Sequence, residues 1–282
     1  MERNVISVLF ILVSLLTVSC SKLDPLFSNG EPVIEQREVS QHFNSISMYN
    51  NVNVKLKHDN RPHLELTCPE NLLEKITTEI DGDTLYIKNE NDFNWLRSYG
   101  YSIDLTVYYD SLLQINYASI GSLTCAEDDT IKGFSIRQMN TTTSIDTTYI
   151  ADTIFSIDTT VNTAFIYPKT FFLNINEGCG DIDLTLSCDV VKNDFSNGTS
   201  CVSLQGRSEY TEIIMRSYGV IHAENLSSTF VRVKSESTND VYVRFRNKLT
   251  ALIYSIGDVY YYGNPERVVK EGSGEGQVKQ LQ

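Results

Sequence analysis

The chain has 282 residues, 41% of them hydrophobic, which is enough to bury the core of one large domain or two small ones. Its 36 acidic and 23 basic residues give a net charge of -13, which repels the phosphates of nucleic acids and anionic lipid headgroups. We therefore expect no nucleic-acid partner.

The first 19 residues have the features of a signal peptide. Arg3 precedes an apolar run from Val5 to Val18, which is too short to span a bilayer. The run ends in Leu-Thr-Val-Ser-Cys at residues 16–20, which resembles a bacterial lipobox. This pattern predicts cleavage after residue 19 and lipidation of Cys20, although the threonine stands where the usual pattern has leucine.

Residues 20–37 contain Pro25, Gly30 and Pro32 and show little periodicity, so we expect a tether there. Several acyl chains on Cys20 would anchor the protein stably in a membrane. The leader thus predicts a cell-envelope lipoprotein, held at the outer membrane and facing either the periplasm or the exterior. Plain secretion is the alternative for the same leader.

Residues 38–110 predict β-strands without a fixed spacing. Apolar and polar residues alternate over 51–57 and 63–67, as in half-buried strands. An Asp-Gly pair at residues 81–82, flanked by strand-forming residues, predicts a hairpin. We treat this segment as an N-terminal β region.

Residues 111–282 repeat a unit of about 20 residues, in which a turn of small residues is followed by an alternating strand. A fixed period with strand content is typical of a β-solenoid, whose units bury their apolar faces by stacking. The expected fold is all-β, with a parallel β-helix over the repeats. The turn position falls at Gly180, Ser200, Gly219, Asn239, Gly257 and Gly276. We expect glycine to provide a positive φ at these turns.

Residues two apart in a strand point to the same side, so the repeats also predict which residues are buried. One inward column consists of Ile182, Val202, Ile221, Val241, Val259 and Val278, and a second of Leu184, Leu204, Ala223, Val243 and Tyr261. The residues between these columns, which we expect to face outward, are Asp183, Ser203, His222, Tyr242 and Tyr260.

The order and spacing of several segments resemble the head GIN domain family, which is described as auto-transporter-adhesin-like. They are residues 43–46, 51–54, 69–73 and 81–87, the Gly-x-Gly-Asp turns, and residues 262–265 and 272–276. The resemblance covers about residues 38–280 and departs from the family at Ser200, Asn239 and the Thr-rich stretch 139–163. It implies a right-handed parallel β-helix of the pectin-lyase kind, an origin in Bacteroides-like bacteria and an adhesive role. It supplies no catalytic residues.

Three carboxylates, those of Asp181, Asp240 and Asp258, follow the turn position by one residue. Stacked carboxylates suit Ca²⁺, which takes several oxygen ligands. Aspartate beside glycine is also an ordinary turn residue, so we assign no metal and treat these three as weak candidates. We expect no cofactor, because the glycines of residues 272–276 do not lead from a strand into a helix as in a phosphate-binding loop.

Tyrosines are the main candidates for recognition. Tyr242 and Tyr260 share the outward column, and Tyr262 lies close by. Exposed aromatic rings stack on sugars and anchor protein interfaces. Alternatively, these rings only reflect the preference of aromatic residues for strands and cover the end of the solenoid. An uncovered end also permits self-association.

These features predict a non-catalytic envelope lipoprotein that acts as an adhesin, binding a glycan, another polymer or a surface protein. The enzymatic alternative is a degenerate or calcium-dependent polysaccharide lyase or hydrolase. It would need several carboxylates beside a basic residue, for which Arg232, Lys234, Arg244 and Arg246 are the nearby group. A structural spacer or signalling component of the envelope is the third alternative.

Overall fold

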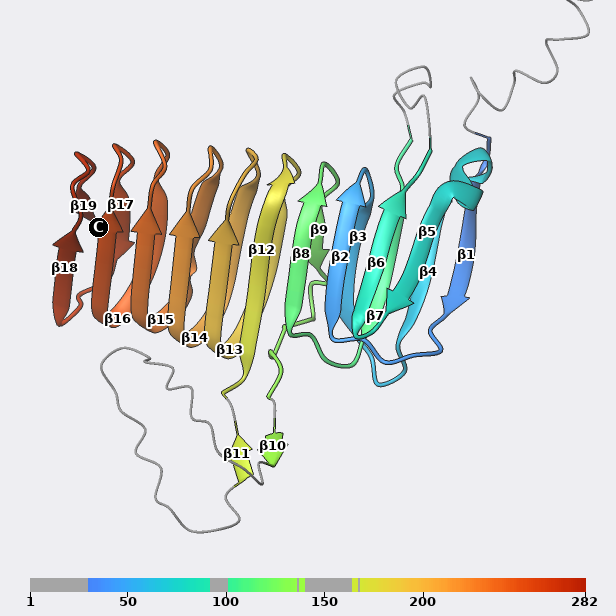
Figure 1. Ribbon diagram of the computed structural model, residues 1–282, viewed down its shortest axis with the longest axis horizontal. Coiled ribbons are helices and arrows are strands. Elements are labelled where there is room, and N and C mark those ends of the chain that lie inside the picture. Colours follow the sequence, from blue (N-terminus) through green and yellow to red (C-terminus); the bar gives the residue numbers. More distant parts are fainter. Residues whose placement is uncertain (1–29, 92–100, 136, 140–163, 167) are drawn as a thin grey trace, which may run out of the picture.

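The computed structural model describes residues 30–91, 101–135, 137–139, 164–166 and 168–282 (Figure 1). The expected signal peptide, Cys20 and nearly all of the Thr-rich stretch lie outside the described residues. Within the described ranges, no helix is both long and apolar enough to cross a bilayer.

The described residues form strands almost throughout, and the all-β class is confirmed. Their one helix is a short 3₁₀ helix, η1 (Glu70–Lys75). The strands are β1 (Pro32–Glu38), β2 (Ser45–Asn50), β3 (Asn53–His58), β4 (His63–Pro69), β5 (Ile76–Asp81), β6 (Thr84–Asn89), β7 (Asp104–Tyr109), β8 (Gln114–Ser119), β9 (Leu123–Cys125), β10 (Arg137–Met139), β11 (Ala164–Ile166), β12 (Thr170–Gly178), β13 (Ile182–Phe195), β14 (Cys201–Met215), β15 (Val220–Ser235), β16 (Val241–Ile253), β17 (Val259–Tyr262), β18 (Arg267–Glu271) and β19 (Val278–Leu281).

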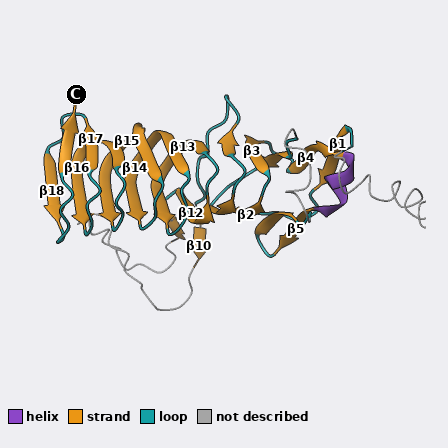
Figure 2. Ribbon diagram, turned by 90° about the horizontal axis from the view of Figure 1, so that it is seen from above, coloured by secondary structure: helices purple, strands orange, loops and turns teal. Residues whose placement is uncertain are grey.

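Most strands stack in two columns of parallel pairings (Figures 1 and 2). The first column runs through β6, β2, β8, β12, the C-terminal halves of β13 to β16, and β18. The second runs through β7, β3, β9, the N-terminal halves of β13 to β16, β17 and β19. Buried side chains from both columns form one hydrophobic core between them.

The register in the repeats is the predicted one. Ile182 pairs with Val202, and the same position pairs onward through Ile221, Val241, Val259 and Val278. The first five side chains are at most 1% exposed. Val278 is partly exposed, because no rung of the described chain follows its own. The outward residues likewise pair in a row from Asp183 through Ser203, His222, Tyr242 and Tyr260.

The N-terminal β region is continuous with the repeats, since all its strands belong to the same 17-stranded sheet. β2 lies between β6 and β8, and β3 lies between β7 and β9. β1, β4 and β5 close this end of the stack through antiparallel pairs. β2 and β3, the first strands of the two columns in chain order, therefore lie one rung in from the end of the columns.

β1 overlaps the range 20–37 in which we expected a tether. Its backbone pairs with β4 from Pro32 to Glu38, and its proline is the first strand residue, where a missing N–H is tolerated. Arg37 fixes the strand further, because its guanidinium donates to the carbonyl of Ile76 (2.7 Å) and to Oγ1 of Thr78 (2.9 Å). Ordered structure thus begins earlier than expected.

The expected reason for the turn glycines was wrong. Positive φ occurs at other glycines, such as Gly178 (120°) and Gly198 (114°), and not at the turn position. At the turn position the constraint is closeness to the preceding rung. A Cβ on Gly219 would lie 2.2 Å from the carbonyl oxygen of Ser200, and one on Gly276 would lie 2.1 Å from that of Gly257.

Candidate functional site

The outer face of the second column carries a row of stacked rings near the C-terminal end. The ring of Tyr242 lies parallel to those of His222 (centroids 4.9 Å apart) and Tyr260 (5.1 Å). This spacing follows from the parallel sheet, whose strands are about 4.8 Å apart. Lys279 continues the row, with Nζ 5.5 Å from the centroid of the Tyr260 ring.

The stacking changes how these tyrosines can recognise a ligand. Both faces of the Tyr242 ring are covered by its neighbours, and the faces of Tyr260 are covered by Tyr242 and Lys279. A sugar ring therefore cannot stack on Tyr242 as the sequence suggested. The row presents ring edges and hydroxyl groups. Burial, and then the negative charge of Asp240, raise the pKa of Tyr242, so its hydroxyl stays protonated at neutral pH.

A second outward row runs beside the rings, with arginines on alternate strands. Arg207 pairs with Ser227, Ser227 with Arg244, and Arg244 with Tyr262. The guanidinium of Arg244 lies 5.4 Å from the centre of the Tyr262 ring. Arg246 follows two residues later on the same face of β16 and is also exposed. We call Arg207, Arg244 and Arg246 the arginine cluster.

Each member of the arginine cluster makes one hydrogen bond, and none makes an ion pair within the described ranges. Nε of Arg207 donates to Oγ of Ser187 (3.1 Å), and Nε of Arg244 donates to the carbonyl of Glu224 (2.7 Å). Nη2 of Arg246 donates to a threonine hydroxyl (3.0 Å). A guanidinium has five N–H donors, so most of them face solvent. Arg244 and Arg246 could be noted from the sequence, but Arg207 was missed. It stands twenty residues after Ser187 and twenty before Ser227 in an outward column.

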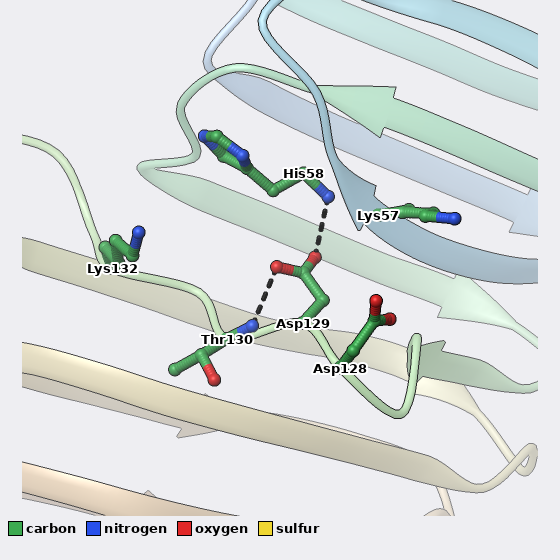
Figure 3. Close-up of a pocket in the computed structure, with 6 residues that line it drawn as sticks. All are labelled: Lys57, His58, Asp128, Asp129, Thr130 and Lys132. Atoms are coloured by element: carbon green, nitrogen blue, oxygen red, sulfur yellow. Dashed lines mark hydrogen bonds between the residues drawn. The ribbon is translucent and has the colours of Figure 1, made fainter.

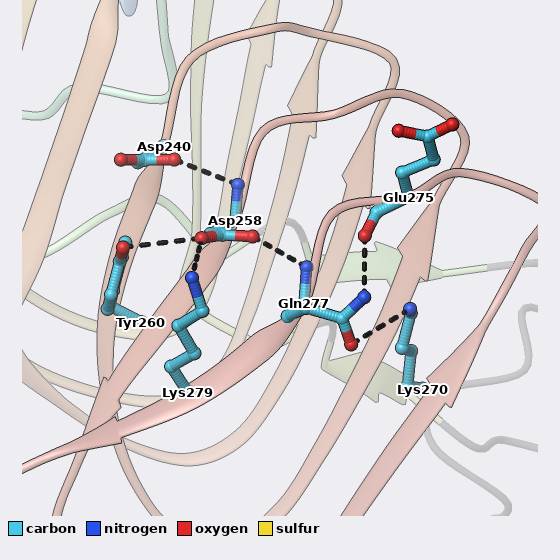
Figure 4. Close-up of polar contacts among 7 residues, drawn as sticks. All are labelled: Asp240, Asp258, Tyr260, Lys270, Glu275, Gln277 and Lys279. Carbon is cyan, nitrogen blue, oxygen red and sulfur yellow. Dashed lines mark hydrogen bonds and ion pairs between the residues drawn. The ribbon is translucent and has the colours of Figure 1, made fainter.

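The aspartates of the turn column bind the backbone of the next rung (Figure 4). Oδ1 of Asp240 accepts the N–H of Asp258 (2.8 Å), and Oδ1 of Asp258 accepts that of Gln277 (2.6 Å). Asp181 is three rungs away from Asp240. Within the described ranges, no group of three or more His, Cys, Asp or Glu side chains could hold a metal ion.

Asp258 is the most connected of these carboxylates. Its Oδ2 forms an ion pair with Lys279 and accepts the hydroxyl of Tyr260 (3.3 Å). Burial alone would raise the pKa of Asp258, but the hydrogen bonds from Lys279 and from the N–H of Gln277 lower it below the ordinary value. The sequence did not indicate that Lys279, which lies one rung after Asp258, forms an ion pair with it.

A separate pocket of about 270 Å³ lies against the N-terminal half of the stack (Figure 3). Its buried carboxylate, Asp129, accepts hydrogen bonds from the backbone N–H of His58 (2.8 Å) and Thr130 (2.7 Å) and from the hydroxyl of Tyr109 (2.9 Å). Burial, and then the charge of Asp129, raise the pKa of Tyr109. Oδ2 thus joins β3 and β7 to the segment after β9, and Oδ1 is engaged by the N–H of the next residue in that segment. The remaining lining residues are Lys57, Asp128 and Lys132.

The sequence was compared with models of known protein families. One model, described as "Putative auto-transporter adhesin, head GIN domain", matches residues 42–265. The chain belongs to this family. The match confirms the resemblance drawn from the spacing of the motifs. Among curated proteins, none matches the sequence.

Solved structures resemble this head GIN domain over most of its length. A putative adhesin from Bacteroides fragilis is 15% identical, with a TM-score of 0.69 over 90% of this chain and 100% of that one. A putative lipid binding protein from Parabacteroides distasonis is 16% identical, with a TM-score of 0.59 over 91% and 99%. A putative adhesin from Parabacteroides merdae is 14% identical, with a TM-score of 0.54 over 90% and 98%. At these identities the similarity shows a shared fold.

Membership of an adhesin family indicates a protein of the cell surface or envelope that binds a surface partner. In this head GIN domain, the structure brings Tyr242 and Tyr260 into contact and places Tyr262 beside Arg244. Within the described residues, the outer face of β14 to β17 therefore carries guanidinium and hydroxyl donors that face solvent.

Proposed function

We propose that the protein is a lipid-anchored adhesin of the cell envelope and that it binds an acidic glycan on the outer face of the second column. Residues 1–19 are its signal peptide and Cys20 its lipidated N-terminus. Residues 20–37 contain the tether, which ends where β1 begins. The head GIN domain follows as an N-terminal β region (38–110) and a right-handed parallel β-helix (111–282). Two parallel columns with a repeat of about 20 residues support this architecture.

The observation that carries the proposal is the arginine cluster. Three guanidiniums that have no carboxylate partner among the described residues lie on one sheet face of a chain whose net charge is -13. Guanidinium groups bind carboxylates and sulfates through paired N–H donors. The face is rigid, because its strands are paired on both sides, so little order is lost on binding. An acidic polymer lying across the strands would meet Arg207, Arg244 and the edge of Tyr262.

Binding assays with immobilised polysaccharides test this function. Residues 21–282, which retain every described strand, would be applied to polygalacturonate, a sulfated glycan and neutral amylose at low and high salt. We expect saturable binding to the acidic polymers alone, weakened by salt. Arg207→Ala plus Arg244→Ala should reduce the affinity at least about tenfold, since charged hydrogen bonds are lost.

The matched control is Arg216→Ala, which removes an arginine already paired with Asp194 (2.6 Å). It should leave binding unchanged, and circular dichroism would verify the fold of each variant. Equal binding to amylose, or equal loss in Arg216→Ala, would contradict an acidic-glycan site. Cleavage of the polymer in the presence of calcium would favour the lyase or hydrolase alternative.

The anchor is tested separately. Palmitate labelling of cells that produce the full chain should give a labelled protein in the membrane fraction. Cys20→Ala should abolish the label, and Cys179→Ala should retain it, because Cys179 lies in an exposed turn within the domain. An unlabelled wild-type protein in the medium would instead indicate plain secretion.

A further inference from the structure

A second surface runs along the turns that lead from the first column to the second. We call it the turn edge; it contains the turns after β8, β12, β13, β14, β15, β16 and β18 and lies at the top of Figure 1. In each turn, a small residue (Gly or Ser) stands two positions before the turn residue defined above. We call the single residue between these two the tip of the turn. The tips are Ile120, Cys179, Thr199, Tyr218, Thr238, Ile256 and Glu275.

Exposed apolar side chains concentrate on the turn edge. In the described part of the chain, six large hydrophobic residues are exposed, and four of them are here. They are Tyr218 (69% exposed), Ile256 (59%), Ile120 (57%) and Tyr254 (47%). Exposed apolar side chains that gather on one edge indicate a contact with a partner or a membrane.

The turns that carry these side chains are held rigidly. The N–H of Ile120 donates to the carbonyl of Asn50 (2.8 Å), and that of Tyr218 donates to Gly198 (3.2 Å) on the rung before. The tips therefore cannot fold back onto the domain. Because the backbone of these tips is already fixed, only side-chain freedom is lost when a tip enters another phase.

The described chain also begins at the turn edge. β1 is antiparallel to β4, and β4 is antiparallel to β7, so β1 runs in the direction of the second column. Strands of that column start at the turn edge, which places Pro32, the first residue of β1, at that edge. Gly30 follows Cys20 by ten positions, a span of at most about 35 Å. An anchor on Cys20 would therefore hold a membrane close to this edge.

We propose that the turn edge lies on the membrane to which the chain is anchored, with Ile120, Tyr218, Tyr254 and Ile256 entering the headgroup region. This inference rests on the proposed lipidation of Cys20. Tyrosines are enriched at membrane interfaces, where the ring is buried and the hydroxyl remains hydrated. The rod then lies along the bilayer, and the arginine cluster on the sheet face remains open to a ligand.

The charge of the turn edge indicates which lipid headgroups it can contact. Acidic residues flank the tips, namely Glu177, Asp181 and Asp240, whereas Glu236 is paired with Lys234 (2.5 Å). They would repel phosphatidylglycerol and other anionic lipids, within the range set by ionic strength. The surface that fits the edge is therefore zwitterionic.

Fluorescence on vesicles tests this placement. Residues 21–282 with an N-terminal His tag would be attached to phosphatidylcholine vesicles through a nickel-chelating lipid, in a Trp95→Phe background. A reporter at Ile256→Trp should shift to the blue and be quenched by brominated lipid. The matched reporter Ser203→Trp, on the outward sheet face, should show neither effect. Quenching at residue 203 but not at 256 would overturn the proposal.

A second measurement does not depend on an introduced reporter. Without the tag, the wild-type fragment should partition weakly into phosphatidylcholine vesicles, and Tyr218→Ser plus Ile256→Ser should lower the partition coefficient at least about tenfold. Adding phosphatidylglycerol should weaken partitioning. Unchanged partitioning of the double variant, or a dimer in sedimentation that the same substitutions dissociate, would overturn membrane docking.

The two proposals can fail independently. The vesicle assays supply the anchor chemically, so they report on the turn edge even when Cys20 is not lipidated in cells. The glycan assay depends on Arg207 and Arg244, which lie on the sheet face and not on the turn edge.

Discussion

The ring of Tyr242 lies face to face with that of Tyr260, with 5.1 Å between the centroids and 11° between the planes. The two side chains are outward neighbours on adjacent parallel strands. Each therefore shields the other from solvent, and the pair stabilises the fold as well as shaping the surface.

A double-mutant cycle measures that coupling. Tyr242→Ala and Tyr260→Ala, alone and together, should reveal an interaction of about 0.5–1.5 kcal/mol in the free energy of unfolding, the usual range for aromatic pairs. Urea denaturation provides the values. Tyr242→Phe keeps the stack and serves as the control, so a loss as large as that of the alanine variant would show that the hydroxyl is responsible.

A charge in the inward column should be severely destabilising. Val202 is fully buried between Ile182 and Ile221, so Val202→Asp would place a carboxylate without a partner in the core. We expect a loss of roughly 4 kcal/mol or more in urea denaturation. Ser203→Asp adds the same charge on the outward face and should cost less than about 1 kcal/mol. Similar losses in the two variants would contradict the assigned register.

The turn glycines should resist substitution for a steric reason. A Cβ on Gly219 would lie 2.2 Å from the carbonyl oxygen of Ser200 and 2.3 Å from a ring carbon of Phe195. Gly219→Ala should therefore lower the melting temperature, with a loss of about 1–3 kcal/mol from displaced backbone. Thr238→Ala, at an exposed tip, should change stability by less than about 0.5 kcal/mol. A tolerated alanine at 219 would mean that the rungs can separate at little cost.

Asp258 should contribute to the acid sensitivity of the fold. Because its pKa is lowered in the folded state, its contribution is complete above the ordinary aspartate pKa of about 3.9 and is lost as the pH falls through the lowered value. We expect Asp258→Asn to be less stable than wild type by about 1 kcal/mol at pH 7, a modest value because Lys279 is exposed to solvent. The difference between the two proteins should shrink below about pH 4. A difference that stays constant to lower pH would contradict the lowered pKa.

Asn193 is an unfavourable residue within the core. Its side chain is 1% exposed, and neither its amide nitrogen nor its oxygen has a hydrogen-bond partner in the described part of the chain. It lies between Leu173 and Ile213 in the first column. Asn193→Val should stabilise the protein by about 1–3 kcal/mol in urea denaturation, because no polar group is left buried. Asn174→Val, which removes a hydrogen bond to Asn116 (3.0 Å), should give no such gain.

The repeats could be predicted because each rung pairs with the next one at a short and regular step in the sequence. Side chains that point inward recur at a step of about 20 residues, so the partners of Val202 and Tyr242 follow from counting. The same counting placed Tyr242 beside Tyr260. The repeat step predicts which residues are neighbours, but it does not predict how their rings are oriented. The sequence therefore did not show that the faces of the Tyr242 and Tyr260 rings are covered.

The N-terminal half could not be predicted in the same way. Ser45 pairs with Thr84 on one side and with Gln114 on the other, and neither step matches the repeat. The capping strands β4 and β5 interrupt the period because they close the stack with antiparallel pairs. The arginine cluster was found only in part, since its members belong to different strands and stand out only because they form no ion pair with the residues that the structure describes.

The position of β2 and β3 inside the stack also determines when the fold can form. As the chain leaves the ribosome, residues 45–58 emerge before their neighbours on the two sides, which arrive with residues 84–109 and 114–125. The first coil thus has neighbours on both sides only after residues 114–125 have been made. Until then the apolar side chains of β2 and β3 lack the neighbours that bury them in the folded protein.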